Sequence, residues 1–311
     1  MGENRVLVVS ATGYIGRHIV NACLEQGHPT FVQVRPEAAR DVEKVQLVLS
    51  FRRAGAKIFW VSLDDHDELV KLLKQVDVVI CTVSHFHLDE QYKLINAIKE
   101  AGNIKKFYPS EFGTDVDRNP HIPPGDKLFT DKVAIRRTVE ALGIPYTYIS
   151  ANCFMGFFLP SFAQLEPLCK FVPPGDSVVI HGDGNVKIVW MAEKDIGTYT
   201  AKSIDDPRTL NRTVYFRPPK NVLTMNEQVA IWESKIGKAL KKSYLSEKEL
   251  FAKYIQDEKH PWLTRAAAAH MYEIFHRGDL YFDFGPDDLE ASVLYPEVEY
   301  TTAESYLELF V

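Results

Sequence analysis

Apolar and polar positions along the first half of the chain form two alternating kinds of segment. Short apolar runs, which favour strands, are each followed by longer stretches with apolar residues every three or four positions, which favour helices. The expected strands are RVLVVS, PTFVQVR, AKIFWVS, VDVVICTV, KKFYPS and PYTYIS. The expected helices span residues 14–26, 42–55, 66–74, 88–102 and 126–142. This order predicts an α/β fold with a doubly wound parallel sheet, the Rossmann architecture that binds NAD(P).

The pattern changes after Asn152. Pro and Gly cluster in VPPGDS, and SVVIHGDGNVKIVW predicts two strands around a turn at residues 182–185. Further helices are expected at residues 193–204, 226–236, 246–255 and 262–277. We therefore expect a Rossmann domain at residues 1–152. Residues 153–311 are expected to form a smaller substrate-binding α/β region that also completes the sheet and closes a cleft.

Composition and charge narrow the class of protein. The 311 residues are 46% hydrophobic and 25% charged, which is ordinary for a globular chain. The net charge of −6 argues against a nucleic-acid partner. No apolar run reaches the roughly 18 residues of a membrane span, and no signal-peptide core is evident at the N-terminus. The four cysteines, Cys23, Cys81, Cys153 and Cys169, lack metal-binding spacing, so we expect reduced thiols, no metal site and a cytoplasmic location.

The segment SATGYIG, residues 10–16, follows the first expected strand and has the spacing of a phosphate-binding turn. Gly13 would let the backbone approach a pyrophosphate, and Gly16 would let helix and strand pack closely. The helix that starts near Tyr14 would direct its N–H groups at the phosphates, and Thr12 could add a hydroxyl donor. Ser10 occupies the turn position where glycine adopts positive φ more cheaply. A packing role alone remains the alternative for such a glycine pair.

Arg35 follows the second expected strand, where dinucleotide-binding folds distinguish the two nicotinamide cofactors. An acidic side chain there binds the ribose 2′-hydroxyl of NADH, whereas arginine suits the 2′-phosphate of NADPH. Lys44, on the next helix, could add positive charge. We therefore expect NADPH as cofactor, with a solvated surface arginine as the alternative.

Lys132 is the candidate catalytic residue. It lies on the helix expected after KKFYPSEFGTD, in which a strand ends in a loop at the functional edge of the sheet. Short-chain dehydrogenases use Tyr-x-x-x-Lys on such a helix, but the tyrosine position is Leu128 here. Lys132 would therefore have to move protons itself, with its pKa lowered by burial. The alternative is a solvated helix lysine, like the nearby Arg136 and Arg137.

These motifs, together with GIPYTYISANCF, HGDGNVK, DPRTLN and RGDLY, give the chain a family resemblance. The chain resembles, nearly end to end, the plant isoflavone reductase-like reductases, which are atypical short-chain dehydrogenases. They include pinoresinol-lariciresinol, phenylcoumaran benzylic ether and isoflavone reductases. The resemblance implies NADPH, a phenolic substrate such as a lignan, and a homodimer. Many relatives carry two glycines where this chain has Ser10 and Ala11.

The resemblance also places site residues. The cofactor loop maps to Ser10, Thr12, Gly13, Tyr14, Ile15 and Gly16. The 2′-phosphate arginine maps to Arg35, the catalytic base to Lys132, and the nicotinamide pocket to Asn152, Cys153 and Phe154. Side chains suited by type to an aromatic substrate pocket are Phe86, Phe112, Met155, Phe157, Phe158, His270 and Tyr272. Burial in the core is the alternative for each of them.

The function expected from these residues is NADPH-dependent reduction of a lignan. The base removes a phenolic proton, the benzylic ether opens to a quinone methide, and hydride adds at the benzylic carbon. The short stretch TVSHFHLDEQYKL keeps a phenylcoumaran benzylic ether or isoflavone reductase open as alternatives. A non-catalytic NADP-binding regulator is the alternative from another class, because fold alone does not fix function. A sugar-nucleotide epimerase is disfavoured, since it would need the missing tyrosine.

Overall fold

The computed structural model describes residues 4–166 and 170–311, so the expectation for Cys169 lies outside the described residues. Cys23, Cys81 and Cys153 are free and buried. Within these ranges, no helix is both long enough and apolar enough to cross a membrane.

The N-terminal half forms a parallel sheet in the order β3-β2-β1-β4-β5. Its strands are β1 (Val6–Val9), β2 (Thr30–Val34), β3 (Lys57–Trp60), β4 (Val78–Cys81) and β5 (Lys106–Tyr108). The central strands β1 and β4 are buried along their whole length. Helices cover both faces of these strands, which is why their sequences are continuous apolar runs rather than alternating ones.

The second half of the chain completes the same sheet. β6 (Thr147–Ser150) follows β5, to which a parallel bridge between Phe107 and Tyr146 connects it. β10 (Arg212–Tyr215) and then β13 (Leu289–Glu290) continue it in parallel. The predicted α/β fold with a central parallel sheet is therefore confirmed. The division at residue 152 stays a prediction.

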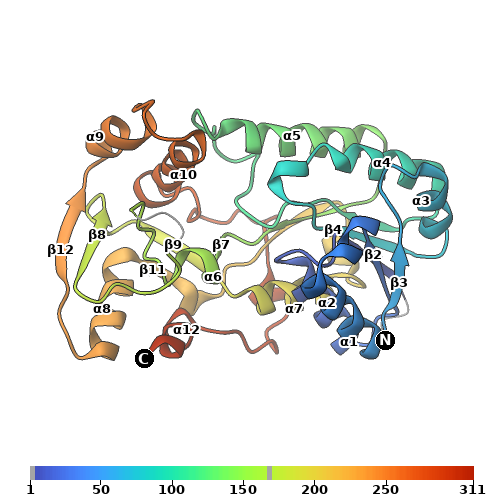
Figure 1. Cartoon of the computed structure of the whole chain (residues 1–311), viewed down its shortest axis with the longest axis horizontal. Coiled ribbons are helices and arrows are strands. Elements are labelled where there is room, and N and C mark those ends of the chain that lie inside the picture. Colours follow the sequence, from blue (N-terminus) through green and yellow to red (C-terminus); the bar gives the residue numbers. More distant parts are fainter. Residues whose placement is uncertain (1–3, 167–169) are drawn as a thin grey trace.

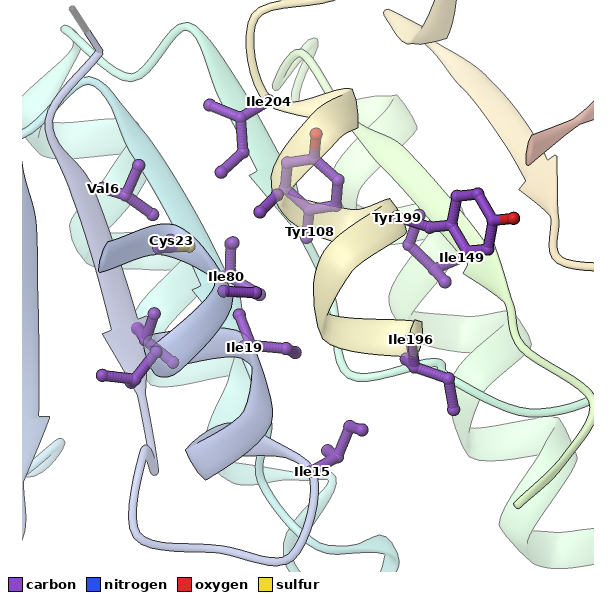
Figure 2. Close-up of a cluster of buried hydrophobic side chains, with 14 of the residues drawn as sticks. Val6, Ile15, Ile19, Cys23, Ile80, Tyr108, Ile149, Ile196, Tyr199 and Ile204 are labelled. Carbon is purple, nitrogen blue, oxygen red and sulfur yellow. The ribbon is translucent and has the colours of Figure 1, made fainter. Parts of the chain in front are cut away.

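Two groups of helices cover the two faces of the sheet (Figure 1). One face is covered by α1 (Gly16–Glu25), α2 (Val42–Arg53) and α7 (Glu193–Ser203). The other face is covered by α3 (His66–Leu73), α4 (Glu90–Ala101) and α5 (Asp126–Ala141). Apolar side chains of α1 and α7 meet over the sheet, as Ile19, Ile80 and Ile196 illustrate in Figure 2. α1 and α7 run so close together that a Cβ on Gly197 would lie 2.5 Å from the His18 carbonyl oxygen.

A smaller region with its own apolar core lies beside the sheet (Figure 1). Its strands are β7 (Cys153–Phe154), β8 (Ser177–His181), β9 (Lys187–Met191), β11 (Val222–Thr224) and β12 (Lys241–Leu245). Its helices are α6 (Met155–Phe158), α8 (Met225–Ile236), α9 (Glu247–Leu250), α10 (Trp262–Tyr272) and α12 (Ala303–Leu307). α11 (Ala291–Leu294) instead follows β13 and packs in the core of the large sheet. Single π-helical turns, Phe251–Ile255 and Glu273–Arg277, extend α9 and α10 to the ends predicted for these helices. Short 3₁₀ turns occupy Pro36–Arg40, His85–His87, Pro207–Thr209, Pro219–Asn221 and Glu308–Phe310.

The two strands predicted around the turn at residues 182–185 are present but do not pair with each other. β8 pairs in parallel with β12, whereas β9 lies between β7 and β11. Gly182 and Gly184 both adopt positive φ. They redirect the chain from one small sheet to the next instead of closing a hairpin.

Candidate active site

Two cavities lie near each other on the carboxyl side of the sheet. A polar cavity of about 480 Å³ is lined by residues that follow β1, β2, β3 and β4. An apolar cavity of about 420 Å³ lies between α5 and α10 and contains Lys132 in its wall. The turn after β4 contributes to both, because Ser84 and His87 line the polar cavity and His85 lines the apolar one. The arrangement suits a dinucleotide whose reactive end meets a second, apolar ligand.

Five of the predicted cofactor residues line the polar cavity: Ser10, Thr12, Gly13, Arg35 and Lys44. Residues that motif reasoning missed also line it, including Gln33, Ser62, Asp64, Thr82, Ser84, His87 and Glu90. Gln33 is fully buried and helps to hold the turn at Ser10. Its side-chain oxygen accepts a hydrogen bond from the Ser10 amide at 3.1 Å.

The turn at Ser10 does adopt the left-handed conformation, with φ of 58°. This conformation costs a non-glycine residue on the order of 1 kcal/mol. Local bonds hold the turn in place: the Gly13 amide donates to the Ser10 carbonyl at 3.0 Å. The Thr82 hydroxyl donates from the end of β4 to the carbonyl oxygens of Val9 at 2.8 Å and Ser10 at 3.2 Å. The serine therefore forms the tight turn at a cost that its neighbours offset.

Three predicted loop residues, Tyr14, Ile15 and Gly16, lie outside the lining of the polar cavity. Ile15 belongs to the apolar core between α1 and α7 (Figure 2). A Cβ on Gly16 would lie 2.9 Å from the Ala11 Cα and the Ser10 carbonyl oxygen, so Gly16 permits close packing. The Tyr14 side chain is directed to Glu193 on α7.

Arg35 and Lys44 present positive charge at the polar cavity. Arg35 is exposed directly after β2. No carboxylate pairs with it among residues 4–166 and 170–311, so its guanidinium is available to an anion. Lys44 is 3.0 Å from Asp41, the residue that caps α2. The stronger candidate for a 2′-phosphate ligand is therefore Arg35.

The apolar cavity has a largely aromatic and aliphatic wall. It is lined by His85, Thr114, Leu128, Phe129, Lys132, Asn152, Cys153, Phe157, Phe158, Phe171, Leu263, Ala266, His270, Met271 and Ile274, among others. Phe157, Phe158 and His270, which we predicted for an aromatic substrate pocket, all line this cavity. Their contact with a substrate stays a prediction. Asn152 and Cys153 line this cavity rather than the polar one.

Other predicted pocket residues lie elsewhere. Phe112 and Met155 are buried in the core. Phe86 is 60% exposed and its ring is tilted against that of His85, while Tyr272 packs on Phe251 and His276. Phe154, predicted for the nicotinamide pocket, packs against the Tyr14 ring. These placements follow from helix and strand direction, which residue type alone does not reveal.

Lys132 lies in the second turn of α5, and its Nζ donates to the Glu111 carbonyl oxygen at 2.8 Å. Burial lowers the pKa of Lys132 below its ordinary value; the Glu111 carboxylate opposes this shift and the Arg136 guanidinium adds to it. His85 is close enough that the charge of Lys132, in addition to burial, lowers the pKa of its imidazole. The shift makes loss of the ammonium proton easier than in a solvated lysine, which is the direction that a general base requires.

Arg136 is not a solvated helix residue, as its neighbour Arg137 is. It is only 2% exposed, and its Nε donates to Glu111 Oε1 at 2.8 Å, with a second bond from Nη2 to Oε2. Its Nη1 reaches Asp115 at 2.7 Å. The prediction of solvation was wrong for Arg136 because its partners come from the distant loop after β5. This network holds the loop that supplies the acceptor for Lys132.

One residue within this loop and one just after β6 have unusual backbone conformations. Phe112 has φ of 48° and Asn152 has φ of 57°. The Phe112 amide donates to the Ile149 carbonyl at 3.0 Å, and the Asn152 amide donates to the Gly113 carbonyl at 3.1 Å. Backbone strain of this kind persists where surrounding bonds enforce it, and it concentrates at functional sites.

The polar side chains of the apolar cavity that motif reasoning missed include His85 and Thr114. The Thr114 hydroxyl is a buried atom with no hydrogen-bond partner among the described residues. His85 begins a short 3₁₀ turn after β4 and Thr114 lies in the loop after β5, and neither periodicity nor spacing marks such positions. Across the same part of the chain, no group of three or more His, Cys, Asp or Glu side chains is arranged to hold a metal ion.

Comparison with known proteins agrees with this geometry. The model of the NmrA-like family matches residues 2–307. Bifunctional pinoresinol-lariciresinol reductase 1 of Thuja plicata is 51% identical, with 99% of each chain covered. Phenylcoumaran benzylic ether reductase PT1 of Pinus taeda is 50% identical over 99% of each chain. The solved structure of AtPrR2 with NADP⁺ and (+)pinoresinol superimposes with a TM-score of 0.94 at 46% identity, covering 100% of both chains. The expected resemblance is thereby confirmed, and the chain belongs to the NmrA-like family.

Proposed function

We propose that the protein is an NADPH-dependent reductase of lignans of the pinoresinol and lariciresinol type. It opens a benzylic ether and adds hydride to the benzylic carbon. The observation that carries the proposal is Lys132, which lies in the wall of an aromatic cavity beside a polar cavity of dinucleotide character. The names of the two plant relatives and the pinoresinol bound by the solved neighbour support this substrate class.

The residues of the polar cavity fit NADPH. Arg35 would pair with the 2′-phosphate, and the backbone near Thr12 and Gly13 would face the pyrophosphate. Asn152 and Cys153 would lie toward the nicotinamide, because they line the adjoining apolar cavity. When bound, the cofactor supplies a hydride.

Lys132 would act as the general base. Its neutral amine accepts the proton of the substrate phenol at Nζ, and the Glu111 carbonyl oxygen orients this nitrogen. The phenolate electrons then expel the benzylic ether oxygen as an alkoxide and leave a quinone methide. The hydride that a bound cofactor would supply adds to the benzylic carbon and restores an aromatic phenolate. Lys132 returns its proton to one of the two oxyanions, and the other takes a proton from water. Phe157 and Phe158 would orient the aryl groups and exclude water. Thr114 and His270 offer further polar contacts in the same wall.

Turnover assays test the proposal. With NADPH and (+)-pinoresinol, we expect NADPH oxidation by the wild type and loss of at least about 100-fold in kcat for Lys132→Met, the scale of general-base catalysis. NADPH binding should persist in that variant. Lys127→Met is the matched control, because Lys127 lies on the same helix but is exposed and pairs with Asp131. Substantial activity in Lys132→Met would exclude the assigned base.

A phenylcoumaran benzylic ether reductase is the second candidate, favoured by the 50% identity to the Pinus taeda enzyme. The same assay with dehydrodiconiferyl alcohol in place of pinoresinol separates the two. Faster turnover of that substrate would assign the second function. Tight NADPH binding without oxidation in the presence of either compound would favour a non-catalytic regulator.

Three further expectations belong to the proposal: a homodimer, a cytoplasmic location and a functional division near residue 152. The dimer and location rest on the resemblance and the composition. Light scattering of the purified chain tests the dimer, and a fluorescent fusion tests the location.

A further inference from the structure

Tyr14 lies at the centre of the glycine-rich loop, but its side chain is directed to the smaller region. Its hydroxyl donates to Glu193 Oε1 at 2.7 Å. The same carboxylate oxygen accepts a hydrogen bond from the Gly156 amide at 2.9 Å. Glu193 is only 6% exposed, so this oxygen joins two segments away from bulk water. Charge-assisted bonds of this kind are stronger than neutral ones.

The ring of Tyr14 extends this linkage to the apolar cavity. Its centroid lies 4.4 Å from that of Phe157, a lining residue of the cavity, and 6.1 Å from that of Phe154. The backbone of α6 is seated tightly on the pair, because a Cβ on Gly156 would overlap the Tyr14 hydroxyl. The same Cβ would lie 2.9 Å from Glu193 Oε1.

Glu193 provides a fixed point for both partners. It lies in the first turn of α7, one turn before Gly197, where α7 contacts the backbone of α1 at His18. α1 is the helix that continues directly from the glycine-rich loop. Burial and the bond to Glu193 raise the pKa of Tyr14, so the hydroxyl keeps its proton and remains a donor.

We propose that Tyr14, Glu193 and Gly156 form a linkage through which the cofactor loop positions the Phe157 wall of the substrate cavity, so that NADP(H) and substrate bind cooperatively. Tyr14 is a positioning residue in this proposal. The inference rests on the proposed function, since it assigns the two cavities to cofactor and substrate. A ligand that holds the loop in one conformation also holds the wall, and such coupling must be reciprocal.

The test is the affinity for (+)-pinoresinol measured by calorimetry with and without saturating NADP⁺, which permits binding without turnover. In the wild type we expect tighter binding in the presence of NADP⁺. Tyr14→Phe keeps the ring and removes only the hydroxyl. We expect the ratio of the two dissociation constants to fall by about tenfold or more, the equivalent of one charge-assisted bond. NADP⁺ titrations with and without pinoresinol should give the same ratio.

Tyr295→Phe is the matched control, because Tyr295 donates to Asp206 at 2.9 Å and lines neither cavity. It should leave the ratio unchanged. Glu193→Gln provides a second variant, which keeps an acceptor without charge and should reduce the ratio less than Tyr14→Phe does. A wild-type ratio of one, or an unaltered ratio in both variants, would overturn the inference. A wild type that reduces no lignan with NADPH would instead contradict the proposed function.

Discussion

Replacing Arg136 by methionine should destabilise the protein strongly. The guanidinium is 2% exposed and neutralises Glu111, whose carboxylate is equally enclosed, and Asp115 beside it. Methionine can occupy much of the same volume but leaves those carboxylates without a counter-charge. Removing one member of a buried ion pair costs about 3–5 kcal/mol, mostly because a buried charge is left uncompensated. We expect a loss of this size in the free energy of unfolding.

Chemical denaturation at pH 7, followed by both tryptophan fluorescence and circular dichroism, measures the loss. Coincidence of the two transitions shows whether a single free energy of unfolding describes the chain. Arg137→Met is the control, because that side chain is about half-exposed and pairs with Asp117 and Glu140 at the surface. Exposed pairs contribute at most about 1 kcal/mol. Equal losses in the two variants would refute the assignment of Arg136 as a buried charge centre.

Catalysis should respond as well, because the loop held by Arg136 supplies the carbonyl that orients Lys132. At a temperature where Arg136→Met remains folded, we expect kcat to fall while the dissociation constant for NADPH changes little. The polar cavity is lined by neither Arg136 nor Glu111. A weakened NADPH affinity with normal kcat would show that the network serves another purpose.

Three other substitutions test local features. Ser10→Gly should raise the free energy of unfolding by about 0.5–1 kcal/mol, since it relieves the strain at φ of 58°; a lower thermal midpoint would contradict this. Gly16→Ala should lower stability although alanine favours helices, because its Cβ would press on the Ala11 and Ser10 backbone; unchanged unfolding in urea would argue against that close packing. Burial raises the pKa of Glu273, but bonds from His121 and His270 outweigh it and lower the pKa to about 2. The ionised Glu273 carboxylate therefore contributes fully to the free energy of unfolding above roughly pH 4.5, and this contribution is lost as the pH falls toward 2. In urea titrations, Glu273→Gln should make the free energy of unfolding less dependent on pH across that interval.

The alternation of strands and helices could be predicted because β1 and β4 are covered on both faces, which requires continuous apolar runs. β10 and β13 were not predicted, because neither forms a continuous apolar run. Arg212 and Thr213 are only partly buried, and β13 has two residues. Their pairing depends on β6, far away in sequence, rather than on a local pattern.

For the site, motif and spacing identified the residues whose role is tied to a local element. Arg35 follows a strand and Lys132 lies on a helix, so position along the chain implies position in the cleft. His85 and Thr114 lie in the connecting segments after β4 and β5, whose path is set by contacts with distant segments, and no sequence pattern identifies them. The burial of Arg136 could not be predicted for the same reason, because its partner Glu111 comes from the loop after β5, whose path the local sequence does not reveal.

Late segments of the chain complete the first sheet, and this has a consequence for folding during synthesis. α7 covers α1, and β10 and β13 extend the sheet beyond β6, yet all three are synthesised after the predicted Rossmann segment. A nascent chain that ends at Asn152 would expose the apolar face of α1, with Ile15 and Ile19, and an unpaired edge at β6. Exposed faces and edges of this kind recruit chaperones or aggregate. Arrest of translation at that point should therefore yield a chain that depends on chaperones, even though it contains the entire glycine-rich loop.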